Sequence, residues 1–242
     1  MSSKVIAIDG PCYVGKSTVA RELSILMSYK HINTGHMYRA VAREALLQRI
    51  PLEDKEDIIK IANYLDIHFE IRDSITRTIV DGQDLTDSLD LPEIVSSTPK
   101  IALIPELRKI LTEKQRSYLD KDFVILEGRD IGSVVFPDAI WKFFITASLE
   151  VRAKRMEKLL IEKQVTPLPE RKNIKEKIVE IDETDRNRAI APLKMAKDCL
   201  IYDNSDSPSE LQDAYILQYY INHKTEMIDN VSTIKKIDKN EK

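Results

Sequence analysis

The residues with the clearest chemical meaning lie near the start of the chain. Residues 10–17 read Gly-Pro-Cys-Tyr-Val-Gly-Lys-Ser, which matches the pattern G-x-x-x-x-G-K-[ST]. An apolar run, Val5 to Ile8, precedes them, and an amphipathic helical pattern opens near Ser17. In that setting the loop N–H groups point at phosphate oxygens, and the helix N-terminus adds about half a positive charge. The spacing therefore predicts a nucleotide phosphate-binding loop.

The side chains of this loop suit ATP with Mg²⁺ as its cofactor. Lys16 can neutralise the β- and γ-phosphates, and the Ser17 hydroxyl can hold Mg²⁺ through the nucleotide. Three loop residues are bulkier than usual, which the pattern tolerates because its inner contacts come from the backbone. The predicted ATP-binding residues of the loop are Gly10, Pro11, Cys12, Tyr13, Val14, Gly15, Lys16, Ser17 and Thr18. The loop itself does not name the reaction.

The group that receives the phosphate must be identified from other parts of the chain. An acceptor that is itself a phosphate monoester needs a second anion site, for which the planar arginine fork is suited. Arginines follow predicted strands in three segments, at Arg39, at Arg129, and at Arg186 with Arg188. Ligands of parallel sheets lie at such strand ends. A single arginine is more often a solvated surface residue, but recurrence beside glycine turns favours a site.

Four segments together resemble the bacterial cytidylate kinase family. They are the phosphate loop, Thr34 to Arg39, Gly128 to Ala139, and Asp185 to Leu193. The resemblance runs from about Val5 to Glu210, and the Gly-Arg-Asp-Ile-Gly stretch with its Val-Val-Phe-Pro-Asp continuation is highly specific. It implies an enzyme, an ATP-dependent (d)CMP kinase of pyrimidine nucleotide metabolism. Such an enzyme transfers the γ-phosphoryl group of ATP to CMP or dCMP, giving ADP and CDP or dCDP.

The resemblance also implies roles for individual residues. Asp130 would accept from the exocyclic amine of cytosine, and Arg108 would donate to the ring acceptors with help from the Thr34 hydroxyl. Uracil has an acceptor in place of that amine, and an unmet polar group costs about 1–3 kcal/mol, which favours CMP over UMP. The acceptor phosphate would be held by Arg39, Arg129 and Arg188. These three arginines and Lys16 are the implied catalytic residues.

The sugar site departs from the family pattern. The family usually carries a serine where this chain has Pro99 and an arginine where it has Ile181, and both groups contact the acceptor ribose with Asp185. Neither replacement has a side-chain hydrogen-bond donor. Asp185 alone would then hold the sugar hydroxyls. We therefore expect weaker discrimination between ribose and deoxyribose than is typical of the family.

The scaffold predicted for these residues is an α/β P-loop core. Helical patterns alternate with four apolar runs, which predicts a parallel sheet flanked by helices. The runs are residues 5–8, 123–126, 141–145 and 200–202. A capping box at Ser207 to Glu210 predicts a helix that continues to about Ile221. Residues 67–86 alternate as a hairpin, which matches the small antiparallel NMP-binding insertion of the bacterial enzymes.

A second departure from strand–helix alternation is the charged segment from Glu150 to Arg188. It has helical periodicity on both sides of Pro167 and Pro169, which favours a mobile helical lid over the alternative, a surface helical hairpin. Arg152 and Arg155 at its start are similar to the arginines that close over ATP in related kinases, although arginine-rich surface helices are common.

The predicted organisation is a single nucleoside-monophosphate kinase unit over residues 1–242. Its core covers about 1–34, 105–148 and 190–222, the NMP-binding insertion about 35–104, and the lid about 149–189. The remaining residues, 223–242, lack aromatic side chains and mix opposite charges, so we expect a flexible tail.

Composition sets the remaining expectations. The 242 residues are 43% hydrophobic and carry a net charge of −3, which gives no electrostatic footprint for a nucleic-acid polymer or an anionic membrane. Cys12 and Cys199 suggest neither a disulfide framework nor a metal site. No signal-peptide layout and no run of roughly 18 apolar residues is present. We expect a cytoplasmic monomer. The residues expected to be packed or solvated rather than acid–base catalysts are His31, His36, His68 and His223.

Two alternatives remain at this point. The first is a regulatory ATPase or nucleotide switch without an acceptor, which would leave the arginine-bearing motifs unexplained. The second is a kinase for a different nucleoside monophosphate, against which the pairing of Asp130 with Arg108 argues.

Overall fold

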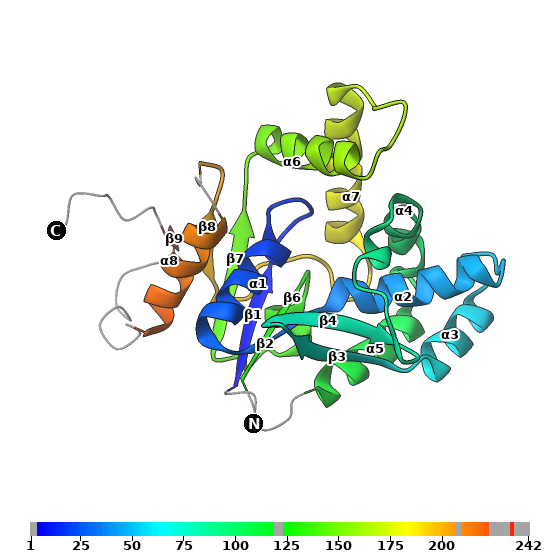
Figure 1. Ribbon diagram of the computed structural model, residues 1–242, viewed down its shortest axis with the longest axis horizontal. Helices are drawn as coiled ribbons and strands as arrows, with labels where there is room; N and C mark the ends of the chain where they lie inside the picture. The colour runs from blue at the N-terminus through cyan, green and yellow to red at the C-terminus, as the bar shows by residue number, and fades with distance from the viewer. Residues whose placement is uncertain (1–3, 119–122, 207–209, 223–232, 235–242) are drawn as a thin grey trace.

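A parallel sheet forms the centre of the molecule (Figure 1). The structure, a computed structural model, describes residues 4–118, 123–206, 210–222 and 233–234. The strands lie in the order β2-β6-β1-β7-β8-β9, and all neighbours pair in parallel. Their bounds are β1 Val5–Asp9, β2 Lys30–Asn33, β6 Val124–Gly128, β7 Trp141–Thr146, β8 Leu200–Asp203 and β9 Thr233–Ile234. Because β1 lies inside the sheet, the phosphate loop leaves from the middle of its carboxyl edge.

Helices cover both faces of this sheet. Ile6 and Ile8 of β1 pack in one apolar cluster with α1 and α8, whereas Val5 and Ala7 pack in another with α2 and α5. Successive strand side chains point to opposite faces, so a strand covered on both faces needs apolar residues throughout. The bounds of these helices are α1 Lys16–Met27, α2 Thr34–Leu47, α5 Pro105–Ser117 and α8 Glu210–Asn222, and a π-helical turn, η2 Ile131–Val135, follows β6.

The insertion between α2 and α5 contains the predicted hairpin. Strands β3 and β4 pair antiparallel from Ile67↔Val80 to Arg72↔Ile75, and β5 adds a short third strand. The backbone reverses at Asp73 and Ser74 and again at Asp81 and Gly82, all of which have positive φ. The elements of the insertion are α3 Lys55–Tyr64, β3 Ile67–Arg72, β4 Ile75–Val80, β5 Gln83–Asp84, η1 Ser88–Asp90 and α4 Pro92–Ile101.

The segment predicted as the lid, and called the lid below, is a pair of helices, α6 Leu149–Glu162 and α7 Arg171–Asn187. Both lie beyond the end of β7, above the phosphate loop in Figure 1. They pack through Ala153, Ile174 and Ile178, and Cys12 of the loop joins the same apolar cluster. The prediction of helices on both sides of Pro167 and Pro169 is confirmed.

The predicted fold class is confirmed, but two strands of the central sheet, β2 and β9, are not predicted by the sequence pattern. The four apolar runs form β1, β6, β7 and β8, but β2 contains a single aliphatic residue, Ile32, among polar neighbours. The predicted capping box begins at residues outside the described ranges. Its helix, α8, ends at Asn222. Of the predicted tail, the described part is Thr233–Ile234, which pairs with β8.

Candidate active site

The phosphate loop joins β1 to α1, and its conformation explains two of its glycines. Gly10 has φ 153°, and a Cβ there would lie 2.2 Å from the carbonyl oxygen of Ile145. Gly15 has φ 92° and caps α1. These positions do not accept a larger residue without rearrangement. The loop thus places the N-terminus of α1 at the carboxyl edge of the sheet.

Lys16 lies buried at the start of α1. Its Nζ donates to the carbonyl oxygen of Pro11 at 2.7 Å. Burial, and after it the positive charge of Arg129, lower the pKa of Lys16 to about 7. A bound polyphosphate would stabilise the charged form of this buried amine.

Ser17 belongs to a buried hydrogen-bond chain. Its hydroxyl donates to Oε2 of Glu127 at 2.9 Å, and Oε1 of Glu127 lies 3.2 Å from Nε2 of His31. Burial favours the neutral acid, but the bonds to His31 and Ser17 and the charge of Lys16 hold the pKa of Glu127 below its usual value. Thr34 Oγ1 donates to the Glu127 carbonyl at 2.7 Å. Glu127 is not among the residues predicted from the sequence, although a carboxylate at the end of a predicted strand is a signal for it.

Asp130, Arg108 and Arg188 form a buried charge cluster. Arg108 Nη2 donates to Oδ2 of Asp130 at 2.8 Å, and Arg188 Nη2 donates to Oδ1 at 3.3 Å. The Arg108 guanidinium lies 5.4 Å from the ring centre of Tyr38, and its Nε has no partner within the described part of the chain. A buried donor of this kind is costly unless a ligand satisfies it. The structure therefore brings together three predicted residues that are distant in sequence.

Arg129 and Asp185 continue this cluster. Arg129 Nε donates to Oδ2 of Asp185 at 2.8 Å, and Arg188 Nη1 lies 3.3 Å from Oδ1 of the same carboxylate. Asp185 thus bridges two arginines, while Arg186, at the neighbouring position, is exposed. The cluster offers several guanidinium groups to an anionic ligand.

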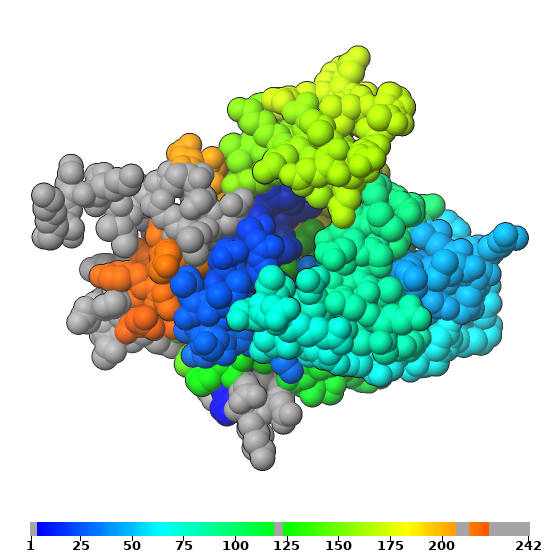
Figure 2. Space-filling view, in the orientation of Figure 1, coloured from blue at the N-terminus to red at the C-terminus, as the bar shows by residue number. Residues whose placement is uncertain are grey.

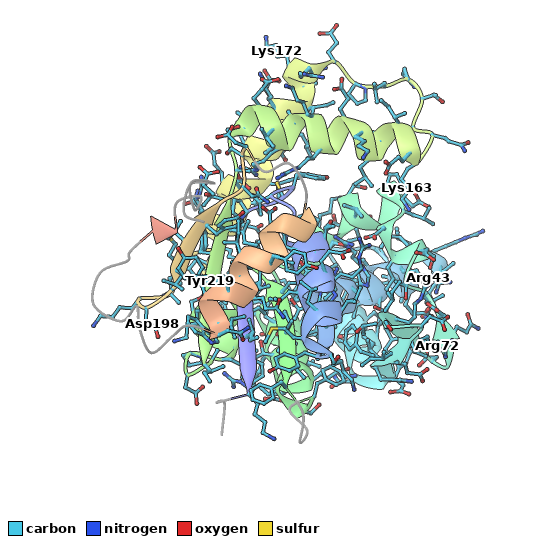
Figure 3. The ribbon with its side chains drawn as sticks, turned by 60° about the vertical axis from the view of Figure 1, so that its left-hand side comes forward. Arg43, Arg72, Lys163, Lys172, Asp198 and Tyr219 are labelled. Atoms are coloured by element: carbon cyan, nitrogen blue, oxygen red, sulfur yellow. The ribbon has the colours of Figure 1, made fainter. Side chains whose placement is uncertain are left out.

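Arg39 has a different partner from the other predicted arginines. It forms an ion pair with Asp90 of the insertion, which also lies 3.6 Å from Nε2 of His36. Burial favours the neutral acid, yet His36, Arg39 and Lys163 hold the pKa of Asp90 below its usual value. Figure 3 shows Lys163 where the lid helix α6 ends. The charge of Asp90 therefore interacts with His36 and Arg39 of α2 and with Lys163 at the C-terminal end of α6.

The two predicted lid arginines contact backbone oxygens of the phosphate loop. Arg152 Nε donates to the Cys12 carbonyl at 2.7 Å, and Arg155 Nη1 donates to the Val14 carbonyl at 3.0 Å. Asp182 and Asn204 hold these guanidinium groups in place. Neither Asp182 nor Asn204 is predicted from the sequence, because their roles depend on contacts between segments that are distant in sequence.

The two residues predicted to depart from the family pattern, Pro99 and Ile181, lie in different surroundings. Ile181 packs against the apolar cluster of Cys12, Ala153, Ile174 and Ile178. Pro99 lies inside α4. The isoleucine therefore adds apolar contact between the lid and the loop instead of a polar group.

The site lies where the lid, the phosphate loop segment and the insertion meet. Figure 2 shows the surface hollowed between the yellow-green lid and the teal insertion, with the blue N-terminal segment beside the hollow. Within the described residues, no three His, Cys, Asp or Glu side chains gather closely enough to bind a metal, and no helix is long and apolar enough to span a membrane.

Comparison with known proteins identifies the family. A family model described as "Cytidylate kinase" matches residues 6–220. The chain belongs to the cytidylate kinase family. The cytidylate kinase of Caldanaerobacter subterraneus subsp. tengcongensis is 40% identical over 85% of this chain and 89% of its own length. That of Clostridium botulinum strain Hall is 40% identical over 96% of this chain and 98% of its own.

Membership of the cytidylate kinase family confirms the resemblance drawn from the four motifs. A third relative, the cytidylate kinase of C. botulinum strain Loch Maree, is 41% identical over 83% of this chain and 90% of its own length. These alignments extend through the core, the insertion and the lid, so the likeness is not confined to the phosphate loop.

Proposed function

We propose that this protein transfers the γ-phosphoryl group of ATP to CMP, and also to dCMP, giving ADP and CDP or dCDP. The observation that carries the proposal is the buried cluster of Arg108, Asp130 and Arg188 beside a phosphate loop, in a chain of the cytidylate kinase family. A regulatory ATPase without an acceptor does not need this second charged cluster. A kinase for a different base does not need Arg108 with Asp130.

The ATP side is proposed to consist of the loop residues 10–18, with Arg152 and Arg155 from the lid. Loop amides and Lys16 would hold the phosphates. Ser17 and Glu127 are hard oxygen donors of the kind Mg²⁺ prefers, so Ser17 is the proposed ligand, with the ion carried by ATP. Bound there, Mg²⁺ would neutralise part of the charge on the β- and γ-phosphates.

The acceptor base is proposed to lie against Asp130, Arg108 and Thr34. Each Asp130 oxygen already receives one guanidinium, and a carboxylate oxygen can accept a further hydrogen bond from the cytosine amine. The Nε of Arg108, which has no partner among the described residues, is a donor suited to a ring acceptor. Asp185 would hold the sugar hydroxyls.

The acceptor phosphate is proposed to lie among Arg39, Arg129 and Arg188. Together with Lys16 these groups would bring two anionic substrates into line and neutralise charge during transfer. Arg39 would exchange its contact with Asp90 for the phosphate, or share the two. Lid closure would exclude water and so limit hydrolysis of ATP. A monomeric state and a cytoplasmic location are proposed on composition alone.

The test of this function is release of ADP from ATP·Mg²⁺ with CMP, dCMP, UMP, AMP or no acceptor. We expect rapid turnover with CMP, slower turnover with UMP, and little ADP without an acceptor. Hydrolysis independent of any acceptor would refute the kinase, and preference for another base would refute the acceptor assignment alone.

The sugar site gives a separate prediction. Changing Pro99 to Ser is expected to raise the ratio of kcat/KM for CMP to that for dCMP by about 3- to 10-fold, the worth of one hydrogen bond. The reason is that serine restores a hydroxyl at a position where proline has no donor. The ratio is measured for both proteins in one assay. An unchanged ratio would show that Pro99 does not affect sugar choice.

A further inference from the structure

The carbonyl groups of the phosphate loop are held by side chains from outside it. Arg152 Nε donates to the Cys12 carbonyl at 2.7 Å. The Val14 carbonyl accepts from Asn204 Nδ2 at 2.7 Å and from Arg155 Nη1 at 3.0 Å. In a trans peptide the N–H points opposite to the C=O. Holding each carbonyl therefore also fixes the N–H of the following residue, which points away from the side chain that holds the carbonyl, and loop N–H groups with fixed directions are what phosphate binding needs.

Arg152 is engaged through all three of its nitrogens. Its Nη1 forms an ion pair with Oδ2 of Asp182 at 2.7 Å, and its Nη2 donates to Oδ1 at 2.8 Å. Nη2 also lies 3.2 Å from the sulfur of Cys12. Arg152, Asp182 and Cys12 are 5%, 4% and 6% exposed. A guanidinium bound this way is fixed to the loop and to α7.

Cys12 completes the contact from the loop side. Its Sγ lies 3.4 Å from Oδ1 of Asp182, and its backbone N–H donates to the same oxygen at 3.4 Å. Burial raises the pKa of the thiol to about 11, so the sulfur remains a neutral thiol that can donate to the carboxylate. Asp182 thus joins two parts of the loop residue to the lid arginine.

The backbone conformation of the phosphate loop at Tyr13 is consistent with a loop held by its contacts with the lid. Tyr13 has φ 57°, in a region that side chains other than glycine rarely occupy. It packs against the cluster of Cys12, Ala153, Ile174 and Ile178 that joins loop and lid. Strained residues of this kind persist where their surroundings hold them.

We propose that Asp182 is a positioning residue for the phosphate loop. It holds Arg152 on the carbonyl of Cys12, so that the loop reaches its binding conformation only with the lid docked on it. Arg152 then serves the nucleotide through the loop backbone and not by direct contact with the γ-phosphate. This inference rests on the proposed function for the identity of the nucleotide.

Changing Asp182 to Asn distinguishes the two roles of Arg152. If Asp182 positions the loop, the variant binds both ADP and the β,γ-imido analogue of ATP about tenfold more weakly, because the loop amides hold the phosphates common to both. If Arg152 instead contacts the γ-phosphate, loss of the Asp182 carboxylate leaves the affinity for ADP unchanged and raises the affinity for the ATP analogue. Both affinities are measured by titration calorimetry without an acceptor.

A matched control and a second variant accompany this measurement. Glu183, the exposed neighbour of Asp182, is changed to Gln and is expected to leave both affinities unchanged. Arg152→Lys keeps the positive charge, but the lysine cannot contact the Cys12 carbonyl and both Asp182 oxygens together. This variant should therefore also bind both nucleotides more weakly, by a similar factor. It replaces Asp182→Asn if that variant does not fold, as judged by circular dichroism.

The outcomes separate this inference from the proposed function. Parallel loss of ADP and ATP-analogue affinity supports the positioning role, whereas unchanged affinity, or a change confined to the ATP analogue, overturns it. The proposed function fails only if the wild-type protein does not phosphorylate CMP. Nucleotide binding by the variants is measured without CMP, so the two failures cannot be confused.

Discussion

Replacing Lys16 by Met is expected to lower kcat for CMP phosphorylation by about a thousandfold. Methionine has a similar length but carries no charge, so the transferring phosphoryl group loses a fixed cation. Removing a single charged or donating group of this kind costs factors of roughly 10²–10⁵ in other enzymes. The measurement is steady-state ADP release with saturating CMP. The exposed Lys60 of α3 changed to Met is the control and should retain full activity.

The same variant is not expected to lose stability. The pKa of Lys16 is about 7 in the folded protein, below its ordinary 10.5, so the unfolded chain holds more protons between these pH values. The cost of burying the amine is therefore full below about pH 7 and declines as pH rises towards 10.5. Methionine removes that cost, together with the bond to the Pro11 carbonyl. A melting temperature well below wild type at pH 7 would contradict a purely catalytic role.

The sheet could be predicted where its strands carry their own signal. Buried parallel strands read as apolar runs because both faces are covered, and β1 is the clearest case, with Val5, Ile6, Ala7 and Ile8 fully or nearly buried. The edge strand β2 lacks this signal. The buried His31 side chain contacts Glu127, and the backbone N–H of His31 donates to Oγ1 of Thr76 in the insertion. The residues of β2 therefore depend on tertiary contacts and show no apolar strand pattern.

The site could be predicted only for groups that belong to short motifs. The phosphate loop and the segments around Arg129 and Arg188 have fixed local spacing, and the structure places Arg108 and Arg188 on Asp130. Asp182 and Asn204 have no such spacing. Each is an ordinary polar residue in the sequence. The lid places Asp182 on Arg152, and the end of β8 places Asn204 on the Val14 carbonyl of the loop. The partner of Arg39 could not be predicted for the same reason.

Replacing Asp130 by Asn is expected to lower kcat/KM for CMP by about a hundredfold, with a smaller loss for UMP. Two buried guanidinium groups, those of Arg108 and Arg188, lose their shared anion, and the cytosine amine loses a charged acceptor. A hydrogen bond to a charged group contributes about 1.5–3 kcal/mol. The Asn amide can donate to the oxygen that uracil has in place of the amine, so the preference for CMP over UMP should fall. Both substrates are compared at limiting concentration.

The control and the ratio make this test specific for the base. Asp198, an exposed carboxylate paired with Lys142, is changed to Asn and should leave the CMP to UMP ratio unchanged. Figure 3 shows Asp198 at the edge of the molecule, well away from the lid. General weakening of the fold in the Asp130 variant would reduce the activity with CMP and with UMP by the same factor, because it lowers the amount of active enzyme whatever the base. A selective loss of activity with CMP therefore assigns base recognition to Asp130, and an unchanged ratio of CMP to UMP activity assigns it to other residues.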